Sequence, residues 1–405
     1  MRPSGHSRGQ RSAAWYAAVR AVARICHPTT RTPQSTLAPS RQGSASDPFA
    51  RDAGSACCVL SRRASKRCVL LACRPPSPTH VSDSRLPRLF IRERHLLALL
   101  DALGGDVGNT DFQKLLFLYC QEQSSSHASI EASAWYDFVP YQYGAFSFTS
   151  YADRRRSVGR SILAEHDQRW ILTGLGRRIV SEYNLEFPPE FVHRYGDLRG
   201  NDLIAKTYRD FPYFATRSSI AESVLHNDPE TLQRIASIRP KRRHPELFTI
   251  GYQDRSLERY LNDLIRASVT LLCDVRRNAI SRKYGFSKST LSRACQGVGI
   301  RYEHLPELGI SSSQRRGIKN EADLAQLFRK YRNQSLLGQS SALQRIQRWL
   351  DAGESVALTC YESDPYHCHR HCAADALRDT TTLLTSRDEA SQPRRSAWTS
   401  TVTHL

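Results

Sequence analysis

The stretch LFTIGYQDRSLERYLNDLIRASVTLLCDVR, residues 247–276, decides the fold of the C-terminal part of the chain. It opens with a short apolar run at 247–250, which predicts a strand. A second and longer apolar run at 269–275 predicts a buried strand. Between the two runs, apolar residues recur at the spacing of one helix face: Leu257, Tyr260, Leu261, Leu264 and Ile265. Strand, helix and strand in this order form the unit from which parallel sheets are built.

The same alternation continues toward the end of the chain. Further strands are predicted at 302–305, 356–360 and 401–405, and further helices around residue 291, at 324–331, at 343–350 and from about residue 368. Alternation of this kind is typical of a mostly parallel sheet with helices on both faces. We therefore predict an α/β domain over about 247–405, after a linker at 238–246.

Ionisable residues follow the predicted strands at the points where the strands end. Open α/β sheets bind ligands outside the carboxyl ends of their strands, so these residues are expected to share one site. The predicted catalytic residues are Asp274, Arg276, Cys360, Glu362, Cys368, His369 and Arg370, and the predicted substrate-binding residues are Tyr252, Tyr284 and Gly309.

Thiol chemistry is one activity that this set could support. Cys368 is expected at a helix N-terminus, where the helix dipole, His369 and Arg370 would all lower the pKa of its thiol. A thiolate beside a histidine is a common nucleophile arrangement. The alternative is a capped helix with a solvated basic start.

Anion binding is the second expectation. Free N–H groups at that helix terminus, together with Arg276 and Arg370, suit a phosphate or a carboxylate. Asp274 and Glu362 could serve as acid and base. We therefore expect a small anionic substrate, such as a nucleotide or a nucleic-acid base. Two plainer interpretations stay open: Asp274 with Arg276 as a structural ion pair, and Cys360 as a packing residue.

Metal binding is a further alternative. Cys368 and Cys372 are four residues apart, and Cys360, His367 and His371 are close in sequence. Zinc sites usually show tighter pairs, such as two cysteines separated by two residues. The prediction therefore includes no metal ligand, and the cofactor is left unknown.

Five motifs of the C-terminal part occur in the order of a known family. They are Thr249-Ile250-Gly251-Tyr252, Asp274-Val275-Arg276, Tyr284-Gly285-Phe286-Ser287-Lys288, Leu305-Pro306-Glu307-Leu308-Gly309, and Cys360-Tyr361-Glu362 with Cys368-His369-Arg370. On these motifs the region resembles the family filed as domain of unknown function 488. The resemblance implies a Rossmann-like fold and an enzyme without a settled reaction. Ile310 departs from the pattern, because the family often has a second glycine there.

Residues 91–237 predict a mainly helical domain. One apolar stripe runs from Leu96 to Leu103 and is closed by Gly104-Gly105; a second runs from Phe112 to Tyr119. Two short helices around a glycine turn outline either a helix-turn-helix or an ordinary helical hairpin. Asp153-Arg154-Arg155-Arg156 is interpreted as a solvated basic helix face.

An aromatic run at 135–147 follows, which fits either base stacking or the core of a strand and turn. With Gln113-Lys114-Leu115-Leu116, the stretch from Phe138 to Ser147 resembles Panacea-type antitoxin domains. That resemblance implies a regulatory or binding module in a prokaryotic conflict or defence system. The alternative to an enzyme is therefore an antitoxin-like protein that senses a small anion or nucleic acid without turnover.

Residues 1–90 carry most of the excess positive charge. They hold 15 Lys and Arg against 3 Asp and Glu, out of a net charge of +19 for the chain. Because this segment has no sustained periodicity, we expect it to be disordered, and the charge is then weak support for a nucleic-acid partner. Its composition fits a transit peptide or upstream DNA translated from a wrong start; the mainly prokaryotic family favours the latter.

Two further features bear on the compartment. The chain has no run of 18 apolar residues, so no membrane partner is expected. Its 11 cysteines are irregularly spaced, which favours a reducing, cytoplasmic location over a disulfide framework. A protein partner and the oligomeric state are not predicted.

Overall fold

The computed structural model describes residues 86–126, 134–241, 244–378 and 402–405. The predicted N-terminal extension, residues 1–90, lies outside the described residues except for its last five positions. Among the described residues, no helix is both long and apolar enough to cross a membrane.

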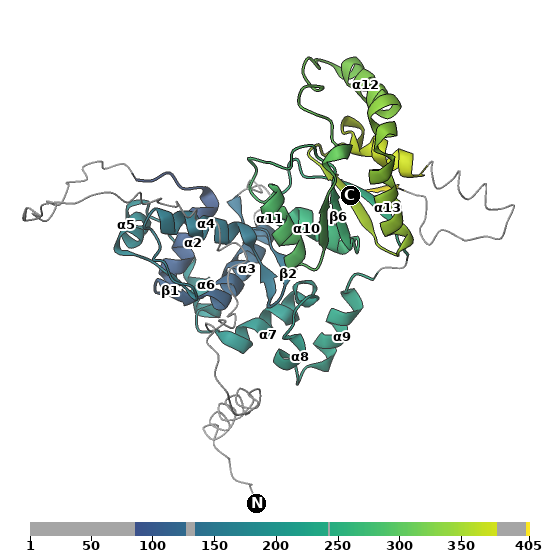
Figure 1. The fold of residues 1–405 in the computed structure, drawn as a ribbon. Helices are drawn as coiled ribbons and strands as arrows, with labels where there is room; N and C mark the ends of the chain where they lie inside the picture. Colours follow the sequence, from purple (N-terminus) through teal and green to yellow (C-terminus); the bar gives the residue numbers. More distant parts are fainter. Residues whose placement is uncertain (1–85, 127–133, 242–243, 379–401) are drawn as a thin grey trace, which may run out of the picture. The chain divides into compact units, whose positions relative to one another are not determined.

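A five-stranded parallel sheet organises the C-terminal region (Figure 1). Its strands are β5 (Leu247–Gly251), β6 (Leu271–Asp274), β7 (Arg301–His304), β8 (Val356–Cys360) and β9 (Val402–His404). The spatial order is β7-β6-β8-β5-β9, and every neighbouring pair is parallel. The predicted α/β, Rossmann-like architecture is therefore confirmed.

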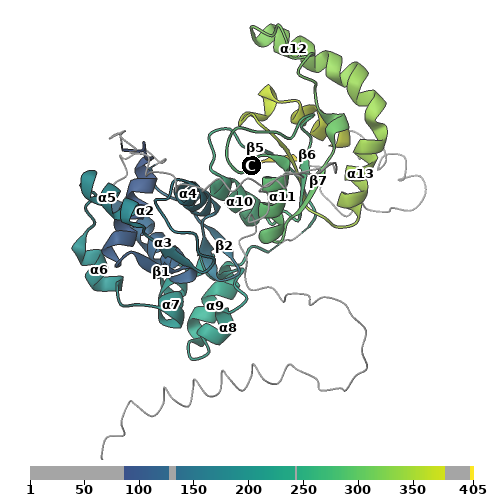
Figure 2. The same cartoon turned by 60° about the vertical axis from the view of Figure 1, so that its left-hand side comes forward.

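Helices cover both faces of this sheet. On one face lie α10 (Leu257–Arg266) and α11 (Lys288–Gly297), and on the other lie α13 (Ser340–Asp351) and a helix at 370–378 (Figures 1 and 2). Side chains alternate along each strand, so Leu272 packs in the first core while Leu271 and Cys273 pack in the second. The helix α12 (Glu321–Lys330) precedes α13.

The connections that follow β6 and β8 leave the sheet in opposite directions. The chain runs from β6 to α11 on one face, and from β8 to the helix at 370–378 on the other. Neighbouring strands with this property leave a crevice at their carboxyl ends, which is where such sheets bind ligands. The fold therefore places the ends of β6 and β8 at the predicted site.

Residues 86–241 are mainly helical, as predicted. The helices are α2 (Ile91–Ala102), α3 (Asn109–Ser126), α4 (Phe148–Gly159), α5 (Gly174–Glu182), α6 (Pro189–Tyr195), α7 (Gly200–Asp210), α8 (Ala221–Val224) and α9 (Pro229–Ile238). Two small antiparallel sheets accompany them, formed by β1 (Asp106–Gly108) with β4 (Arg169–Ile171) and by β2 (Val139–Tyr141) with β3 (Gly144–Phe146).

The predicted tight turn between the first two helices contains a strand. Gly104 and Gly105 have φ angles of 90° and 79°, and they redirect the chain into β1, which pairs with β4. Neither the simple helical hairpin nor the two-helix outline of a helix-turn-helix describes this segment fully. The two apolar stripes are buried as predicted, apart from Leu103, which is partly buried.

The aromatic run forms the hairpin β2–β3 and its approach. Phe138 is buried and its ring meets Phe117 edge-on at 5.1 Å, whereas Tyr143 at the turn is 38% exposed. Gln113 and Lys114 are buried against this hairpin: the Lys114 ammonium donates to the Ala145 carbonyl over 2.8 Å. These contacts favour the strand-and-turn interpretation of the run.

The basic segment in α4 is paired rather than solvated, so that interpretation was wrong for most of it. Asp153 is 1% exposed and accepts from Arg92 over 2.7 Å, while Arg156 contacts Glu93 at 2.8 Å. Arg154 is buried and donates to the Arg169 carbonyl.

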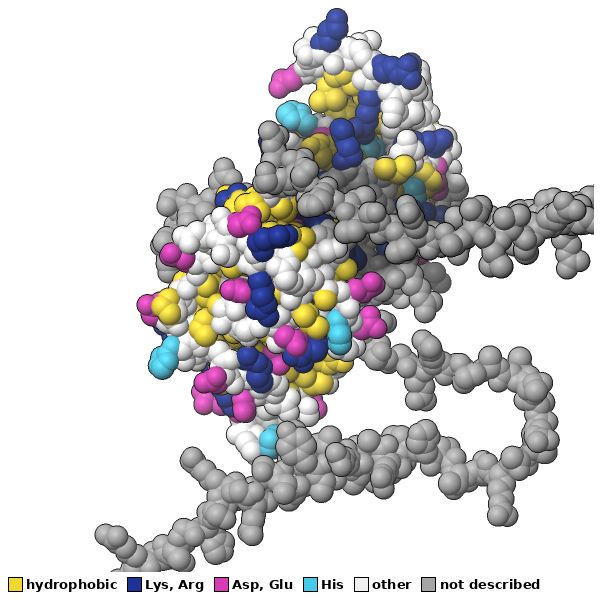
Figure 3. Space-filling model, turned by 90° about the vertical axis from the view of Figure 1, so that its left-hand side faces the viewer, with side chains coloured by type: hydrophobic (Ala, Val, Ile, Leu, Met, Phe, Trp, Pro, Cys, Tyr) yellow, Lys and Arg dark blue, Asp and Glu magenta, His cyan; other side chains and the backbone are white. Residues whose placement is uncertain are grey.

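On the face that carries α5 and α6, acidic and basic side chains are mixed (Figure 3).

Polar contacts join the helical region to the α/β region. Glu258 in α10 is fully buried, and its carboxylate accepts from the Ser147 hydroxyl and from both the backbone N–H and the hydroxyl of Thr149. Burial raises the pKa of Glu258 to about 7. All described residues fall within one compact unit. The division into domains at 91–237 and 247–405 stays a prediction.

Candidate active site

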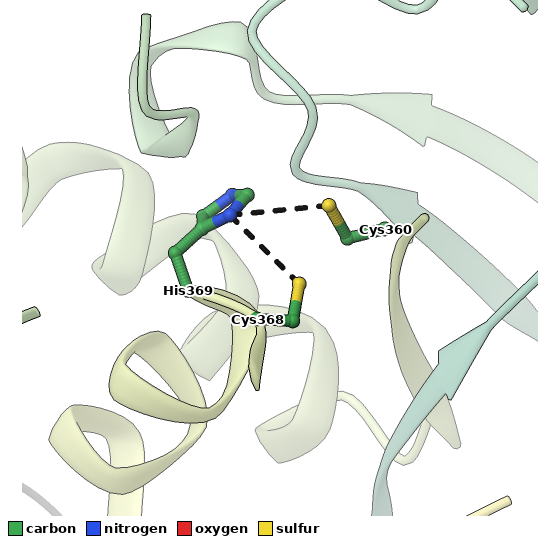
Figure 4. A group of neighbouring side chains, drawn as sticks. All are labelled: Cys360, Cys368 and His369. Carbon is green, nitrogen blue, oxygen red and sulfur yellow. Dashed lines mark hydrogen bonds between the residues drawn. The ribbon is translucent and has the colours of Figure 1, made fainter. Parts of the chain in front are cut away.

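Three side chains from the predicted set meet at the carboxyl edge of the sheet. His369 Nδ1 lies 3.9 Å from Cys360 Sγ and 3.9 Å from Cys368 Sγ, and all three atoms lie within 4.8 Å of one another. The three residues are 1–2% exposed. Figure 4 shows the ring nitrogen facing both sulfurs. We call these residues the thiol–imidazole cluster.

Local structure explains why the three residues converge. Cys360 is the last residue of β8, and Cys368 follows a 3-10 turn at Pro365–His367, which begins where the Asp364 carboxylate accepts the Tyr366 N–H. The His369 Nε2 lies 3.0 Å from the Val275 carbonyl oxygen. Because a carbonyl can only accept, Nε2 must carry a proton, and the lone pair of the neutral ring is then on Nδ1.

The pKa values of the two cysteines shift in opposite directions. The pKa of Cys360 is held well below its ordinary value by the hydrogen bond from Cys368 and, against the effect of burial, by the proximity of His369 and Arg315. Burial and the neighbouring Cys360 raise the pKa of Cys368. At Cys368, Arg370 lowers the pKa by less than burial and Cys360 raise it, so these shifts favour Cys360 over Cys368 as the thiolate. The predicted thiolate at Cys368 stays a prediction.

His369 responds to the same neighbours. Burial alone would lower the pKa of His369, but the charge of Cys360 and the carbonyl of Val275 raise it above its ordinary value. Arg315 Nη2 also lies 3.1 Å from Nδ1, and a guanidinium can only donate. A proton on Nδ1 and Arg315 therefore compete for one lone pair.

Sequence reasoning missed Arg315. It lies in the segment between β7 and α12, where no strand end or helix start marks it. Its guanidinium bridges the cluster and Glu362, with Nη1 3.2 Å from Glu362 Oε1. The usable signal was a basic pair, Arg315-Arg316, shortly after the Leu305–Gly309 motif.

Glu362 is connected to the cluster through Arg315. Its Oε1 atom contacts that guanidinium, while its Oε2 atom is buried and has no hydrogen-bond partner. A buried carboxylate oxygen without a partner costs free energy unless a ligand or water satisfies it. Glu362 is thus suited to accept a hydrogen bond or a proton from a bound molecule.

Asp274 and Arg276 lie at the end of β6 and are bound to each other. The carboxylate of Asp274 accepts from Arg276 Nε over 2.8 Å and from the Tyr302 hydroxyl over 2.7 Å. Arg276 Nη1 donates to the Tyr252 hydroxyl and to the Phe286 carbonyl, each over 2.9 Å. Both side chains are buried and engaged, which favours the structural ion pair that was the alternative to a catalytic role.

Arg370 fastens the loop that follows β8. It is 1% exposed, and its guanidinium donates to the carbonyls of Glu362 over 2.6 Å and Ser363 over 3.0 Å. Its Nε atom has no partner in the structure. Two nitrogens of Arg370 are therefore already hydrogen-bonded, and these bonds fix the backbone at Glu362 and Ser363.

The three predicted substrate-binding residues are placed differently from one another. Tyr252 is buried and stacks on Phe286, with the ring centres 4.4 Å apart. Its hydroxyl accepts from Arg276, and its backbone N–H donates to the Cys360 carbonyl over 3.3 Å. The Tyr284 hydroxyl donates to the Phe148 carbonyl in the helical region. Gly309 packs against the backbone of Arg277, because a Cβ on Gly309 would lie 2.0 Å from the Arg277 nitrogen. None of these three joins the cluster.

The potential metal ligands that the structure brings together differ from those considered from the sequence. Cys372 Sγ contacts His371 Nε2 at 3.4 Å but lies outside the cluster, and His367 pairs with Asp364 at 3.6 Å. Within the described ranges, the group of potential metal ligands is Cys360, Cys368 and His369.

Residues 256–377 match the family model described as "Domain of unknown function DUF488". The α/β region is similar to this family over these residues. The matched residues include β6, β8 and the entire cluster, so the predicted resemblance is confirmed for this region. The description names no reaction.

The remaining comparisons add no relative. Neither the search of curated proteins nor the search of solved structures found a match. The predicted resemblance of about 91–150 to Panacea-type antitoxin domains is not shown by any comparison and stays a prediction.

Proposed function

We propose that this protein is an enzyme that acts on a small anionic substrate at the carboxyl edge of its sheet. The thiol–imidazole cluster is its reactive centre. The observation that carries the proposal is the convergence of two cysteine sulfurs and one imidazole nitrogen, all buried, at the strand ends where α/β sheets bind ligands.

The cluster is more than packing requires. A core position can be filled by apolar side chains, whereas buried ionisable groups cost free energy and gather preferentially at functional sites. A thiol next to an imidazole whose other nitrogen is fixed by a carbonyl matches the arrangement of an activated cysteine. The low pKa of Cys360 supports this assignment.

Arg315 supplies the expected recognition of an anion. Its side chain is 38% exposed, so the guanidinium is accessible from solvent while it also contacts the cluster. Guanidinium groups bind phosphates and carboxylates with two parallel hydrogen bonds. A nucleotide, or another small molecule with a phosphate or carboxylate, fits this chemistry.

Glu362 is the proposed acid–base group. Its buried Oε2 atom has no partner, and its Oε1 atom shares Arg315 with the cluster. A carboxylate in this position could exchange a proton with the substrate bound at Arg315. Asp274, Arg276 and Arg370 are assigned positioning roles, because their hydrogen bonds hold the ends of β6 and β8.

A reducing compartment is part of the proposal. A thiolate centre needs free cysteines, and the six cysteines in the described part of the chain are all free. Cytoplasmic conditions keep thiols in this form. The regulatory alternative, a sensor that binds the same anion without turnover, uses the same residues and is separated from the enzyme by experiment.

The test is conversion of a small-molecule extract by the purified full chain, followed by mass spectrometry. Cys360→Ser and Arg315→Ala are compared with Cys372→Ser and Arg316→Ala as matched controls. We expect substrate loss with the parent and both controls, and a decrease of at least roughly 100-fold with the two cluster variants. Equal conversion by Cys360→Ser and parent would contradict the proposal. A molecule that binds and is never converted would identify a sensor.

A further inference from the structure

We infer that Cys360, Cys368 and His369 form a binding site for a thiophilic divalent cation of the zinc type. The inference deepens the proposed function by naming a metal at the same centre, and it rests on that proposal for the location alone. Metal binding can be measured without any turnover, so the two can fail separately.

The distances between the three ligand atoms support a metal. Zn²⁺ binds sulfur at about 2.3 Å and imidazole nitrogen at about 2.0–2.1 Å, which separates the two by about 3.6 Å in a tetrahedron. The two observed Sγ–Nδ1 distances are both 3.9 Å. A shift of about 0.3 Å would bring each sulfur–nitrogen pair to tetrahedral spacing.

The orientation of His369 is that of a metal ligand. Metal-binding histidines usually donate the other ring N–H to a backbone carbonyl or a carboxylate, which fixes the ring and its tautomer. His369 Nε2 makes this contact with Val275 over 3.0 Å, so the lone pair on Nδ1 faces both sulfurs. Tyr331 also meets the ring edge-on, with the ring centres 5.8 Å apart.

The ligand set leaves room for a substrate. Two cysteines and one histidine form one of the three-ligand sets found in catalytic zinc sites, where the fourth position holds water or substrate. Among the described residues, no further Cys, His, Asp or Glu joins these three within 4.8 Å. Two sulfur ligands favour Zn²⁺ over Mg²⁺ or Ca²⁺, which prefer oxygen.

Arg315 and Glu362 would then contact the water or substrate at the fourth position of the metal. Arg315 Nη2 now lies 3.1 Å from Nδ1, so the guanidinium has to withdraw when a cation takes that lone pair. Arg315 is 38% exposed and lies in a segment without regular helix or strand, so its guanidinium can move toward solvent. From there it could hold an anion bound at the metal, and Glu362 Oε2 could accept from metal-bound water.

The experiment measures zinc in the purified full chain by elemental mass spectrometry, after incubation with Zn²⁺ and removal of the unbound ion. We expect roughly one zinc per chain. Cys360→Ser, Cys368→Ser and His369→Gln should each lose most of it. Cys372→Ser and His371→Gln, which change neighbouring residues outside the cluster, should keep it. No zinc in the parent, or full zinc in Cys360→Ser, would overturn the inference.

A second measurement guards against variants that do not fold. In the parent chain, bound metal should slow the reaction of two thiols with a thiol reagent beyond the effect of their burial, and a chelator should restore the faster rate. A disulfide between Cys360 and Cys368 would instead be opened by a reductant and not by a chelator, which would contradict metal binding. Turnover by a parent chain that takes up no zinc would overturn the inference and leave the enzyme, whereas zinc without turnover would do the reverse.

Discussion

At the scale of single residues, glycine sets how closely the loops of the site approach one another. A Cβ on Gly251 would lie 1.8 Å from the backbone oxygen of Glu362. The ends of β5 and β8 can therefore lie side by side, with Gly251 paired to Cys360, only when this side chain is absent. The glycine supports the site without touching a substrate.

We predict that Gly251→Ala destabilises the protein by about 2–3 kcal/mol, because the added methyl group meets backbone that cannot rotate away. Chemical unfolding followed by circular dichroism measures the change. Gly338→Ala is the control, since a Cβ at that position meets nothing within 4 Å. Equal stability of the two variants would show that the loops can separate at little cost.

Substitution within the ion pair of Asp274 and Arg276 distinguishes a structural role of this pair from a catalytic one. We predict that Asp274→Ala lowers the free energy of unfolding by about 3–5 kcal/mol, because it leaves a buried guanidinium without its partner. Asp263→Ala breaks the partly exposed pair with Arg255 and should cost less than about 1 kcal/mol. Unchanged stability of Asp274→Ala with loss of activity would favour catalysis instead.

The sequence predicted which residue types form the site better than it predicted their roles. The place of Cys368 before a helix predicts a lowered thiol pKa, whereas its burial and the nearby Cys360 raise that pKa. Arg315 was missed because its contact with His369 joins positions 54 residues apart. Charge and proximity between distant segments depend on packing, which sequence periodicity does not contain.

At the scale of elements, the strands and helices of the α/β region were predictable. Apolar runs and helix-face spacing locate β5, α10, β6 and β8, because burial on both faces of a parallel sheet requires nearly continuous apolar strands. The strand β1 was not predicted. Three residues are too few for a periodic pattern, and its pairing with β4 joins segments about 60 residues apart.

The loop after β8 depends on one side chain from the following helix. We predict that Arg370→Lys destabilises the protein by about 2–4 kcal/mol, since one ammonium cannot reproduce two buried guanidinium hydrogen bonds. The change should also displace Glu362 and weaken anion binding. Arg378→Lys on the same helix is the control, because Arg378 is 47% exposed. A thermal melt of both variants decides the point; equal melting temperatures would contradict the assigned role.

At the scale of the whole molecule, Glu258 couples stability to pH. Its pKa is raised by burial from 4.5 to about 7, so the folded chain binds this proton more tightly than the unfolded chain does. The contribution of Glu258 to the free energy of unfolding is therefore largest below about pH 4.5. It decreases as the pH rises through about 7, by roughly 3 kcal/mol in total.

Glu258→Gln tests this coupling, because glutamine keeps the shape of the side chain without its charge. We predict that the variant melts at a higher temperature than the parent near about pH 8 and at a similar temperature near about pH 5. Thermal melts at several pH values, read as the difference between variant and parent, cancel the other titrating groups. A difference that does not change with pH would refute the coupling.

We propose that Cys360, Cys368 and His369 act as one centre at the edge of the sheet. X-ray diffraction from crystals of the zinc-loaded full chain, measured at the zinc absorption edge, tests it most directly. We predict an anomalous peak about 2.3 Å from both sulfurs and about 2.0–2.1 Å from His369 Nδ1. A peak at Cys372 and His371, or no peak between the two sulfurs, would contradict it.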